Sequence, residues 1–184
     1  MESGKFYHIY THANGDENIF RSTENYRFFL QRYSHFINPI ARTYAYCLLP
    51  NHIHFLVRIK NQNELTNGLD KQVETEKQLD RLISKPFSNL FSSYTQALNK
   101  LIGRKGSLFI PNFKRNEITS NEYLTTAILY IHSNPVHHGF VKNAATWFWS
   151  SYSSFLSDSP TLLARKEVLD WFGNVEEFKR MHEQ

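Results

Sequence analysis

Apolar and polar positions alternate at the start of the chain, which predicts a strand over KFYHIYTHA, residues 5–13. Two further apolar runs, about 42–48 and 52–59, predict strands joined by the short Leu49-Pro50-Asn51 connection. GSLFIPNFKR, residues 106–115, predicts a fourth strand that is irregular at Pro111. The chain therefore holds enough strands for a small sheet.

Three other segments repeat apolar residues every three or four positions, which predicts amphipathic helices. The first begins after Ser22 and ends before Pro39, and the second runs from about Pro86 to Gly103. The third covers about 120–134, where Thr119 and Glu122 have the spacing of a capping box. A polar segment, 61–85, is interpreted as a surface insertion with room for one helix.

The order strand–helix–strand–strand–helix–strand predicts an α+β fold with a ferredoxin-like, RRM-like split βαβ antiparallel sheet. We expect helices on one face of this sheet and a free opposite face, with the third helix near the strand 52–59. Residues 1–156 would form the domain, and 157–184 a helical C-terminal extension. Because RNA-recognition modules share this order, it does not select a function by itself.

Composition limits the class of protein, its expected location and the charge of its partners. Of its 184 residues, 41% are hydrophobic, enough for a core, and there is a single cysteine, Cys47, so no internal disulfide framework exists. No segment has the length and apolar character of a membrane span or signal peptide, so we expect a cytoplasmic protein. The net charge of +4 and pI of about 9.1 are compatible with a polyanionic partner.

Two histidines stand out in the apolar run LLPNHIHFLVRI. Side chains alternate along a strand, so His52 and His54 share the face opposite to that of Ile53 and Phe55. Two imidazoles at positions i and i+2 can bind one metal ion, although partly buried histidines with ordinary hydrogen bonds would give the same pattern. Two protein ligands are also an incomplete site for a hard divalent cation.

The third predicted helix carries candidates that could complete such a site. Tyr130 and Asn134 are four residues apart, so they stack on one side of a helix, away from the apolar stripe. The alternative is that neither residue has a role in a metal site: Tyr130 would pack at the edge of the helix, and Asn134 would be a terminal residue before Pro135. Pro135 also disfavours a helical conformation for Asn134.

Four motifs occur in order: PNHIHFLV, GRKGSLF, YIHSNPVHHGFV and WSSY. Together they resemble the single-tyrosine HUH transposases, and most closely the REP-associated tyrosine transposases, over most of the chain from about Lys5 to Phe155. The first predicted strand departs from the family pattern, because THANGDEN stands where a basic turn is common. A DNA contact is therefore in doubt there.

The resemblance implies a metal-dependent enzyme. By the family pattern His52, His54 and Asn134 would bind Mg²⁺ or Mn²⁺, and Tyr130 would attack a phosphodiester of single-stranded DNA. The products would be a 5′-phosphotyrosine and a free 3′-OH, which permits strand transfer in DNA transposition or repeat mobilisation without ATP. The expected partner is single-stranded DNA with hairpin ends, and the pattern fits a homodimer or a monomer.

Basic side chains near these motifs are candidates for DNA binding, although solvated loops have similar compositions. The predicted DNA-binding residues are Lys100, Arg104, Lys105, Lys114, Arg115, His137, His138 and Lys142. His132 faces away from Tyr130 in helical projection and is not counted as a ligand. We expect the tryptophans of WFWSSY, Trp147 and Trp149, to pack the tail onto the sheet domain.

Two other functions compete with strand transfer. One is a non-catalytic, domesticated nucleic-acid-binding protein that keeps the sheet without the chemistry. The other is a zinc hydrolase, which is disfavoured because two histidines and an amide are a poor set of ligands for zinc. Intact His52, His54 and Tyr130 favour the transposase reading, since cleavage needs each of them and binding needs none.

Overall fold

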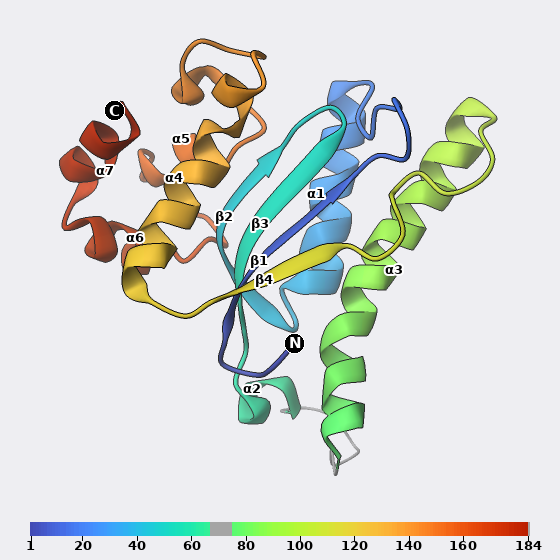
Figure 1. Cartoon of the computed structure of the whole chain (residues 1–184), viewed down its shortest axis with the longest axis horizontal. Coiled ribbons are helices and arrows are strands. Elements are labelled where there is room, and N and C mark those ends of the chain that lie inside the picture. Colours follow the sequence, from blue (N-terminus) through green and yellow to red (C-terminus); the bar gives the residue numbers. More distant parts are fainter. Residues whose placement is uncertain (67–74, 184) are drawn as a thin grey trace.

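A four-stranded antiparallel sheet forms the centre of the protein in the computed structural model, which describes residues 1–66 and 75–183 (Figure 1). The strands lie in the order β2-β3-β1-β4, the order of a ferredoxin-like sheet, so the predicted α+β fold class is confirmed. The strands are β1 (Phe6–His12), β2 (Ala41–Leu48), β3 (His52–Ile59) and β4 (Lys114–Ile118). The helices are α1 (Thr23–Ile37), α2 (Gln62–Thr66), α3 (Glu76–Ile102), α4 (Asn121–His137), η1 (Ala144–Thr146), α5 (Tyr152–Phe155), α6 (Arg165–Phe172) and α7 (Val175–His182).

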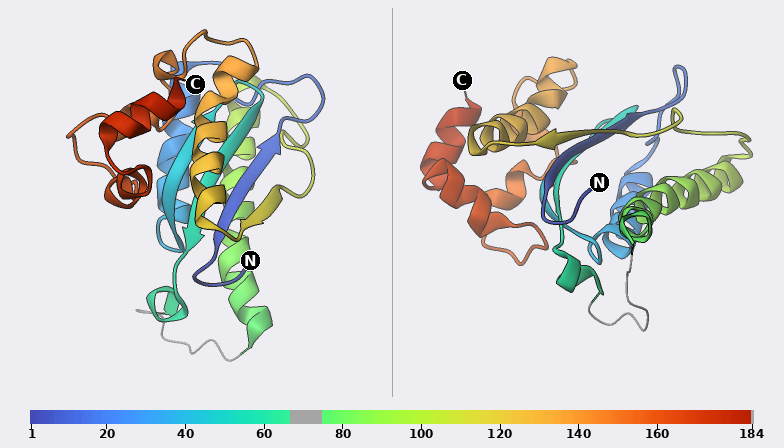
Figure 2. Two further views of the ribbon diagram at one scale, coloured as in Figure 1. Left: turned by 60° about the vertical axis from the view of Figure 1, so that its left-hand side comes forward. Right: turned by 60° about the horizontal axis from the view of Figure 1, so that its bottom comes forward.

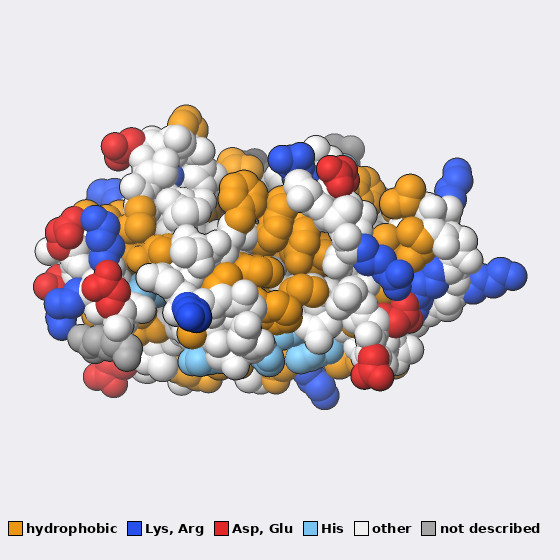
Figure 3. Space-filling model, turned by 90° about the horizontal axis from the view of Figure 1, so that it is seen from above, with side chains coloured by type: hydrophobic (Ala, Val, Ile, Leu, Met, Phe, Trp, Pro, Cys, Tyr) orange, Lys and Arg blue, Asp and Glu red, His pale blue; other side chains and the backbone are white. Residues whose placement is uncertain are grey.

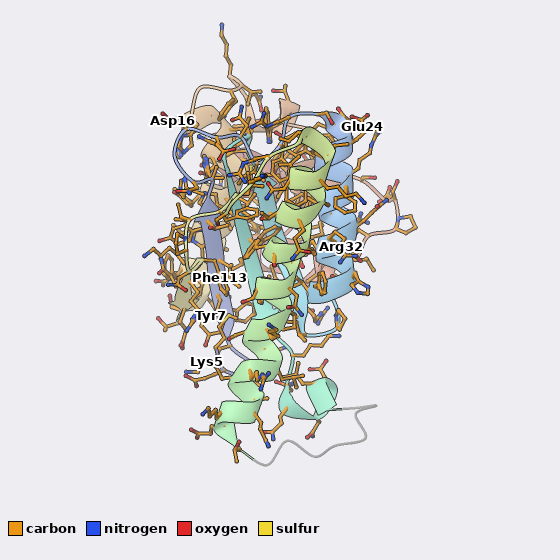
Figure 4. All side chains as sticks on the ribbon, turned by 90° about the vertical axis from the view of Figure 1, so that its right-hand side faces the viewer. Lys5, Tyr7, Asp16, Glu24, Arg32 and Phe113 are labelled. Carbon is orange, nitrogen blue, oxygen red and sulfur yellow. The ribbon has the colours of Figure 1, made fainter. Side chains whose placement is uncertain are left out.

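The two crossover helices, α1 and α3, cover one face of the sheet (Figures 1 and 2). Ile53, Phe55 and Val57 of β3 point to this face and are fully buried against residues such as Phe29 and Phe87. Figure 4 views the molecule from the α3 side, where Tyr7 and Phe113 are labelled. Each large apolar side chain buried in this way stabilises the fold by ~1.5–3 kcal/mol.

The opposite face is not left free, which corrects the prediction of helices on one face only. α4 packs against β2 and β3, and α6 and α7 pack beside α4 (Figure 1). A second core cluster forms there around Leu56, Ile128 and Phe178. The part of this face near His52 and His54 is covered less completely, because Tyr130 of α4 keeps 44% of its surface exposed.

Three predicted boundaries are wrong, and each error has a local cause. α3 starts at Glu76 rather than near Pro86, because Thr75 and Gln78 form a capping box and Pro86 is accommodated inside the helix. α4 is capped by Ser120 rather than Thr119, and it continues through Pro135 to His137, so Asn134 is helical. The predicted insertion 61–85 therefore contains α2 and the start of α3, and its residues 67–74 lie outside the described part.

The fourth strand is also shifted along the chain. β4 spans Lys114–Ile118, whereas residues 106–113 form a loop. This loop meets the end of β1 through the isolated bridge between Ala13 and Phe109 and through the Ile110 N–H, which donates to the His12 carbonyl at 3.0 Å. Apolar residues of this loop, Leu108 and Phe109, are buried under α3 rather than paired in the sheet. Apolar content alone therefore placed the strand too early.

The C-terminal segment docks onto the sheet domain, as expected for WFWSSY. Trp147 Nε1 donates to the Leu48 carbonyl at 3.0 Å, and the Trp149 ring stacks on Tyr26 with centroids 4.4 Å apart. The Ser151 backbone N–H donates to the Tyr46 carbonyl, which adds a short extended segment beside β2. None of the described helices has the length and apolar character to cross a membrane.

Candidate metal and tyrosine site

The two histidines of β3 lie where the sequence places them, on the face opposite to Ile53 and Phe55. β1 pairs with β3 so that His12 is opposite His52 and Tyr10 is opposite His54. α4 crosses this face and brings Tyr130 within ring contact of His54, with centroids 5.7 Å apart and perpendicular planes. The predicted nucleophile and the predicted metal ligands therefore meet at one place, between β3 and α4.

His52 is held by its neighbour in the chain. Its side chain is buried, and its Nδ1 lies 2.8 Å from the Asn51 amide oxygen. Since an amide oxygen only accepts hydrogen bonds, Nδ1 carries the proton and Nε2 keeps its lone pair. That Nε2 is buried and has no hydrogen-bond partner among the described residues, which is unusual for a polar atom in a protein interior.

Asn134 of α4 lies against His52 of β3. Its amide nitrogen donates to the Tyr130 backbone carbonyl at 2.7 Å, which leaves the amide oxygen for other contacts. The Asn134 side chain raises the pKa of His52, as an oxygen beside an imidazole does, although burial and then His138 and His12 lower it more. An unprotonated nitrogen and an amide oxygen therefore approach each other from two elements.

Three imidazoles of this face, those of His8, His52 and His54, have pKa values lowered well below neutral pH. Burial is the main cause, and it lowers the pKa of His52 to about 4 and that of His8 to about 4. Burial followed by the neighbouring His8 and His52 lowers the pKa of His54 to about 2. A neutral imidazole is the form that binds metal ions, so this environment prepares ligands rather than cations.

The residues present fit a divalent ion of the kind that the resemblance implies. His52 Nε2 is a buried acceptor without a partner, and a metal ion would satisfy it. Within residues 1–66 and 75–183, no three His, Cys, Asp or Glu side chains are grouped to hold a metal. Two imidazoles and an amide oxygen would leave positions open for a substrate oxygen, which suits Mg²⁺ or Mn²⁺ better than structural zinc.

Tyr130 lies on the wall of a cleft of about 390 Å³ between the sheet and α4. Its hydroxyl makes no hydrogen bond with any residue that the structure describes. The cleft is lined by His8, Tyr10, His54, Asn116, Tyr123, Thr126, Ala127 and Tyr130. An accessible hydroxyl next to buried imidazoles is suited to attack on a substrate that enters this cleft.

A larger hollow of about 560 Å³ lies on the other side of β4, between α3 and residues 106–115. Hydroxyl and amide side chains of α3 line it, together with Arg115 and Thr11, whose buried Oγ1 has no partner in the described chain. It holds no histidine, cysteine or carboxylate. We therefore place the chemistry in the smaller cleft, where imidazoles and a tyrosine converge.

The predicted DNA-binding residues lie in different parts of the structure. His137 and His138 adjoin the site, since the His138 ring lies 4.4 Å from that of His52 and His137 lies 6.3 Å from Tyr130. Lys114 is opposite Tyr10 and shares the histidine face, whereas Arg115 belongs to the opposite side and lines the larger hollow. Lys100, Lys105 and Lys142 are exposed.

Arg104 does not have the free side chain expected of a phosphate contact. Its guanidinium donates to both carboxylate oxygens of Glu17, to the Asn99 amide oxygen, and to the carbonyls of Gly106 and Ser107. All of its polar groups are engaged in holding the end of α3 and the following loop. Figure 3 shows Lys and Arg side chains spread over the face seen from above, with several of them at its right-hand end, and histidines along its lower border.

Sequence reasoning missed His8. It lies on β1, its Nε2 is 2.9 Å from His54 Nδ1, and its ring meets the edge of Tyr130 at 5.9 Å. The signal was present in HIYTH, where His8, Tyr10 and His12 alternate onto one face. By contrast, His132 is excluded from the site as predicted, because its two nitrogens pair with His182 and Ser151.

Known proteins resemble the chain in sequence and in fold. No protein-family model matches it. A protein of Haemophilus influenzae with the provisional name REP-associated tyrosine transposase is 28% identical over 134 residues, which is 72% of this chain and 67% of that protein. A solved structure of a REP-associated tyrosine transposase bound to a REP hairpin superimposes with a TM-score of 0.59 and 18% identity, covering 86% of this chain and 84% of that one. The resemblance predicted from the four motifs is thereby confirmed: the chain is similar to the REP-associated tyrosine transposases in both sequence and fold.

Proposed function

We propose that this protein is a transposase that cuts single-stranded DNA with hairpin ends through Tyr130 and transfers the cut strand, with Mg²⁺ or Mn²⁺ as cofactor. The observation that carries the proposal is the buried His52 Nε2, an acceptor with no partner in the described chain, which lies beside Asn134 and next to the tyrosine cleft. The hairpin in the related solved structure supports the same class of substrate for this chain.

Tyr130 would act as the nucleophile. Its Oη would lose its proton to solvent and form a bond to phosphorus while the bond from phosphorus to the 3′ oxygen breaks. The leaving oxygen would take up a proton from solvent to become a 3′-OH, so the step is balanced. The DNA end would stay linked to the protein as a 5′-phosphotyrosine. A second 3′-OH could reverse the step and join strands, so transposition or repeat mobilisation would need no other energy source.

His52, His54 and Asn134 would hold the divalent ion. When bound, the ion would polarise the scissile phosphate and offset the charge that develops on it. The side chains contribute by their fixed positions, since both histidine rings are buried and Asn134 is tied to the helix backbone through its amide nitrogen. α4 presents Tyr130 and Asn134 from adjacent turns, which couples the nucleophile to the ligand set.

A labelled hairpin oligonucleotide with single-stranded flanks, taken from the DNA around the gene, tests this proposal. Incubation with Mn²⁺ followed by a denaturing gel should reveal a covalent protein–DNA adduct. The adduct should be absent in Tyr130→Phe and in EDTA. Tyr46→Phe is the control, because Tyr46 of β2 is opposite Phe55 on the other face of the sheet and does not line the tyrosine cleft, and its adduct should persist.

The competing function is a nucleic-acid-binding protein without catalysis. Tight hairpin binding with no adduct from any flanking sequence, in Mg²⁺ or in Mn²⁺, would support it and reject strand transfer. Affinity unchanged by Tyr130→Phe would then be expected, since binding alone does not use the hydroxyl.

A further inference from the structure

His8, which is outside the predicted ligand set, makes a direct side-chain contact with the predicted ligand His54. β1 and β3 are neighbours, and the two rings stack with centroids 5.1 Å apart and planes 26° from parallel. The Nε2 of His8 and the Nδ1 of His54 are separated by 2.9 Å, and both side chains are buried. A hydrogen bond of this length requires one proton between the two nitrogens.

The direction of that proton decides what His54 can bind. A neutral imidazole carries one proton, on Nδ1 or on Nε2. If His8 donates, His54 is protonated on Nε2 and has no lone pair to offer toward the cleft. If His54 donates through Nδ1, its Nε2 is a free acceptor, and His8 must accept at Nε2 with its own proton on Nδ1.

His52 shows which tautomer this face favours. The Asn51 amide oxygen can only accept, so His52 carries its proton on Nδ1 and leaves Nε2 unpartnered. The same arrangement at His54 would give two free Nε2 atoms on adjacent outward positions of β3. Hydrogen bonds to the second nitrogen of ligating histidines commonly fix both ring orientation and tautomer in this way.

We propose that His8 is a positioning residue: it accepts the Nδ1 proton of His54, and this contact fixes the His54 ring with its Nε2 free to bind the divalent ion. This inference rests on the proposed function, because it assigns His54 as a ligand. His8 itself binds no metal in this arrangement, since its Nε2 is used by His54. Asn51 has the corresponding role for His52.

Two variants separate the hydrogen bond from simple packing. In His8→Gln the amide oxygen can stand near the position of Nε2 and still accept, whereas His8→Leu fills similar space without any acceptor. Titration calorimetry with Mn²⁺ should give a dissociation constant about 10–100-fold weaker for His8→Leu. His8→Gln should keep most of the wild-type affinity. His35→Leu, at an exposed histidine near the end of α1, is the control and should match wild type.

Nitrogen-15 NMR of histidine-labelled, metal-free protein reads the tautomers directly and does not depend on any variant folding. Protonation of His54 on Nδ1 and of His8 on Nδ1 is the expected result. Protonation of His54 on Nε2, or equal Mn²⁺ affinity of wild type and His8→Leu, would overturn the role of His8. If wild type and His52→Ala both fail to bind Mn²⁺, the metal part of the proposed function fails, while the NMR result still decides the hydrogen-bond direction.

Discussion

Two pairs of hydrogen-bonded histidines lie in the described part of this protein, and they differ in what their nitrogens contact. His132 and His182 join α4 to α7 through a 2.8 Å hydrogen bond, and their other nitrogens reach Ser151 Oγ at 2.8 Å and the Phe178 carbonyl at 2.7 Å. His8 and His54 are joined by a similar 2.9 Å bond, but the neighbouring His52 keeps a buried nitrogen without a partner.

The difference teaches how to separate structural from functional histidines. Burial and a lowered pKa are common to both pairs, so neither property distinguishes them. Buried polar atoms that are all satisfied add to stability, whereas a buried atom without a partner costs free energy that a bound ligand can remove. The predictions below test this distinction, beginning with the largest expected effect.

The site residues should control activity. His52→Ala should reduce adduct formation by at least about a thousandfold, comparable to the loss of a main electrostatic contributor to catalysis. The readout is the rate of covalent adduct formation on the labelled hairpin. His182→Gln should leave that rate within a few-fold of wild type. Equal losses in the two variants would remove the distinction between the two pairs.

The structural pair should control stability. His132→Ala should lower the free energy of unfolding by about 2–4 kcal/mol, because it opens a cavity in the second core and leaves His182 Nε2 without its partner. His52→Ala should lower it by less than His132→Ala does, since one of the two ring nitrogens of His52 is already without a partner whereas both nitrogens of His132 are hydrogen-bonded. Urea denaturation followed by circular dichroism measures both, and the reverse ranking would contradict the assignment.

Mn²⁺ should stabilise the folded protein only by binding at the site that contains His52. At a free Mn²⁺ concentration of about 100 times the dissociation constant, wild type should gain about 2.7 kcal/mol of stability. The gain should vanish in His52→Ala and persist in His182→Gln. Thermal unfolding with and without Mn²⁺ provides the measurement, and a gain that survives His52→Ala would place the ion elsewhere.

Acid should destabilise the structural pair. Burial lowers the pKa of His182 to about 4 and that of His132 well below its usual value, so in the folded state both stay neutral where the unfolded chain takes up protons. Their contribution is complete above about pH 6.5 and is lost as the pH falls toward about 4. Each withheld proton makes stability fall by about 1.4 kcal/mol per pH unit.

The variant His182→Gln isolates this effect from the other buried histidines. Between about pH 6 and 5 the unfolding free energy of this variant should fall less steeply with falling pH than that of wild type. The difference in slope should correspond to roughly one proton. Denaturation curves across this range give the slope. An unchanged slope would mean that His182 is protonated in the folded protein.

Arginine and lysine at the end of α3 should show the same distinction on a smaller scale. Arg104→Gln should cost about 1 kcal/mol of stability, because its hydrogen bonds hold Glu17 and two loop carbonyls. Lys105→Gln should leave stability unchanged. It should reduce the slope of log affinity against log salt concentration for hairpin binding by the amount expected for about one phosphate contact. Anisotropy titrations at several salt concentrations test this, and an effect of Arg104→Gln on the salt slope would contradict it.

The elements that were predicted correctly came from local sequence patterns that tertiary contacts did not override. β2 and β3 follow from apolar patterning and from the tight connection at Pro50, and the end of α3 follows from Gly103, whose φ is 67°. The start of α3 and the end of α4 were misplaced because Pro86 and Pro135 were taken as boundaries, although both are accommodated inside helices. β4 was misplaced because the loop before it is as apolar as a strand.

The sequence by itself determined which side chains exist for the chemistry and on which face of β3 two of them lie, because alternation along a strand is a local property. Only the tertiary structure decided that Tyr130 and Asn134 approach His52 and His54, that His8 completes the group, and that Arg104 is used internally. These facts depend on how α4 crosses the sheet and on which strands are neighbours. Packing and pairing between segments far apart in the chain set both, and no local pattern encodes them.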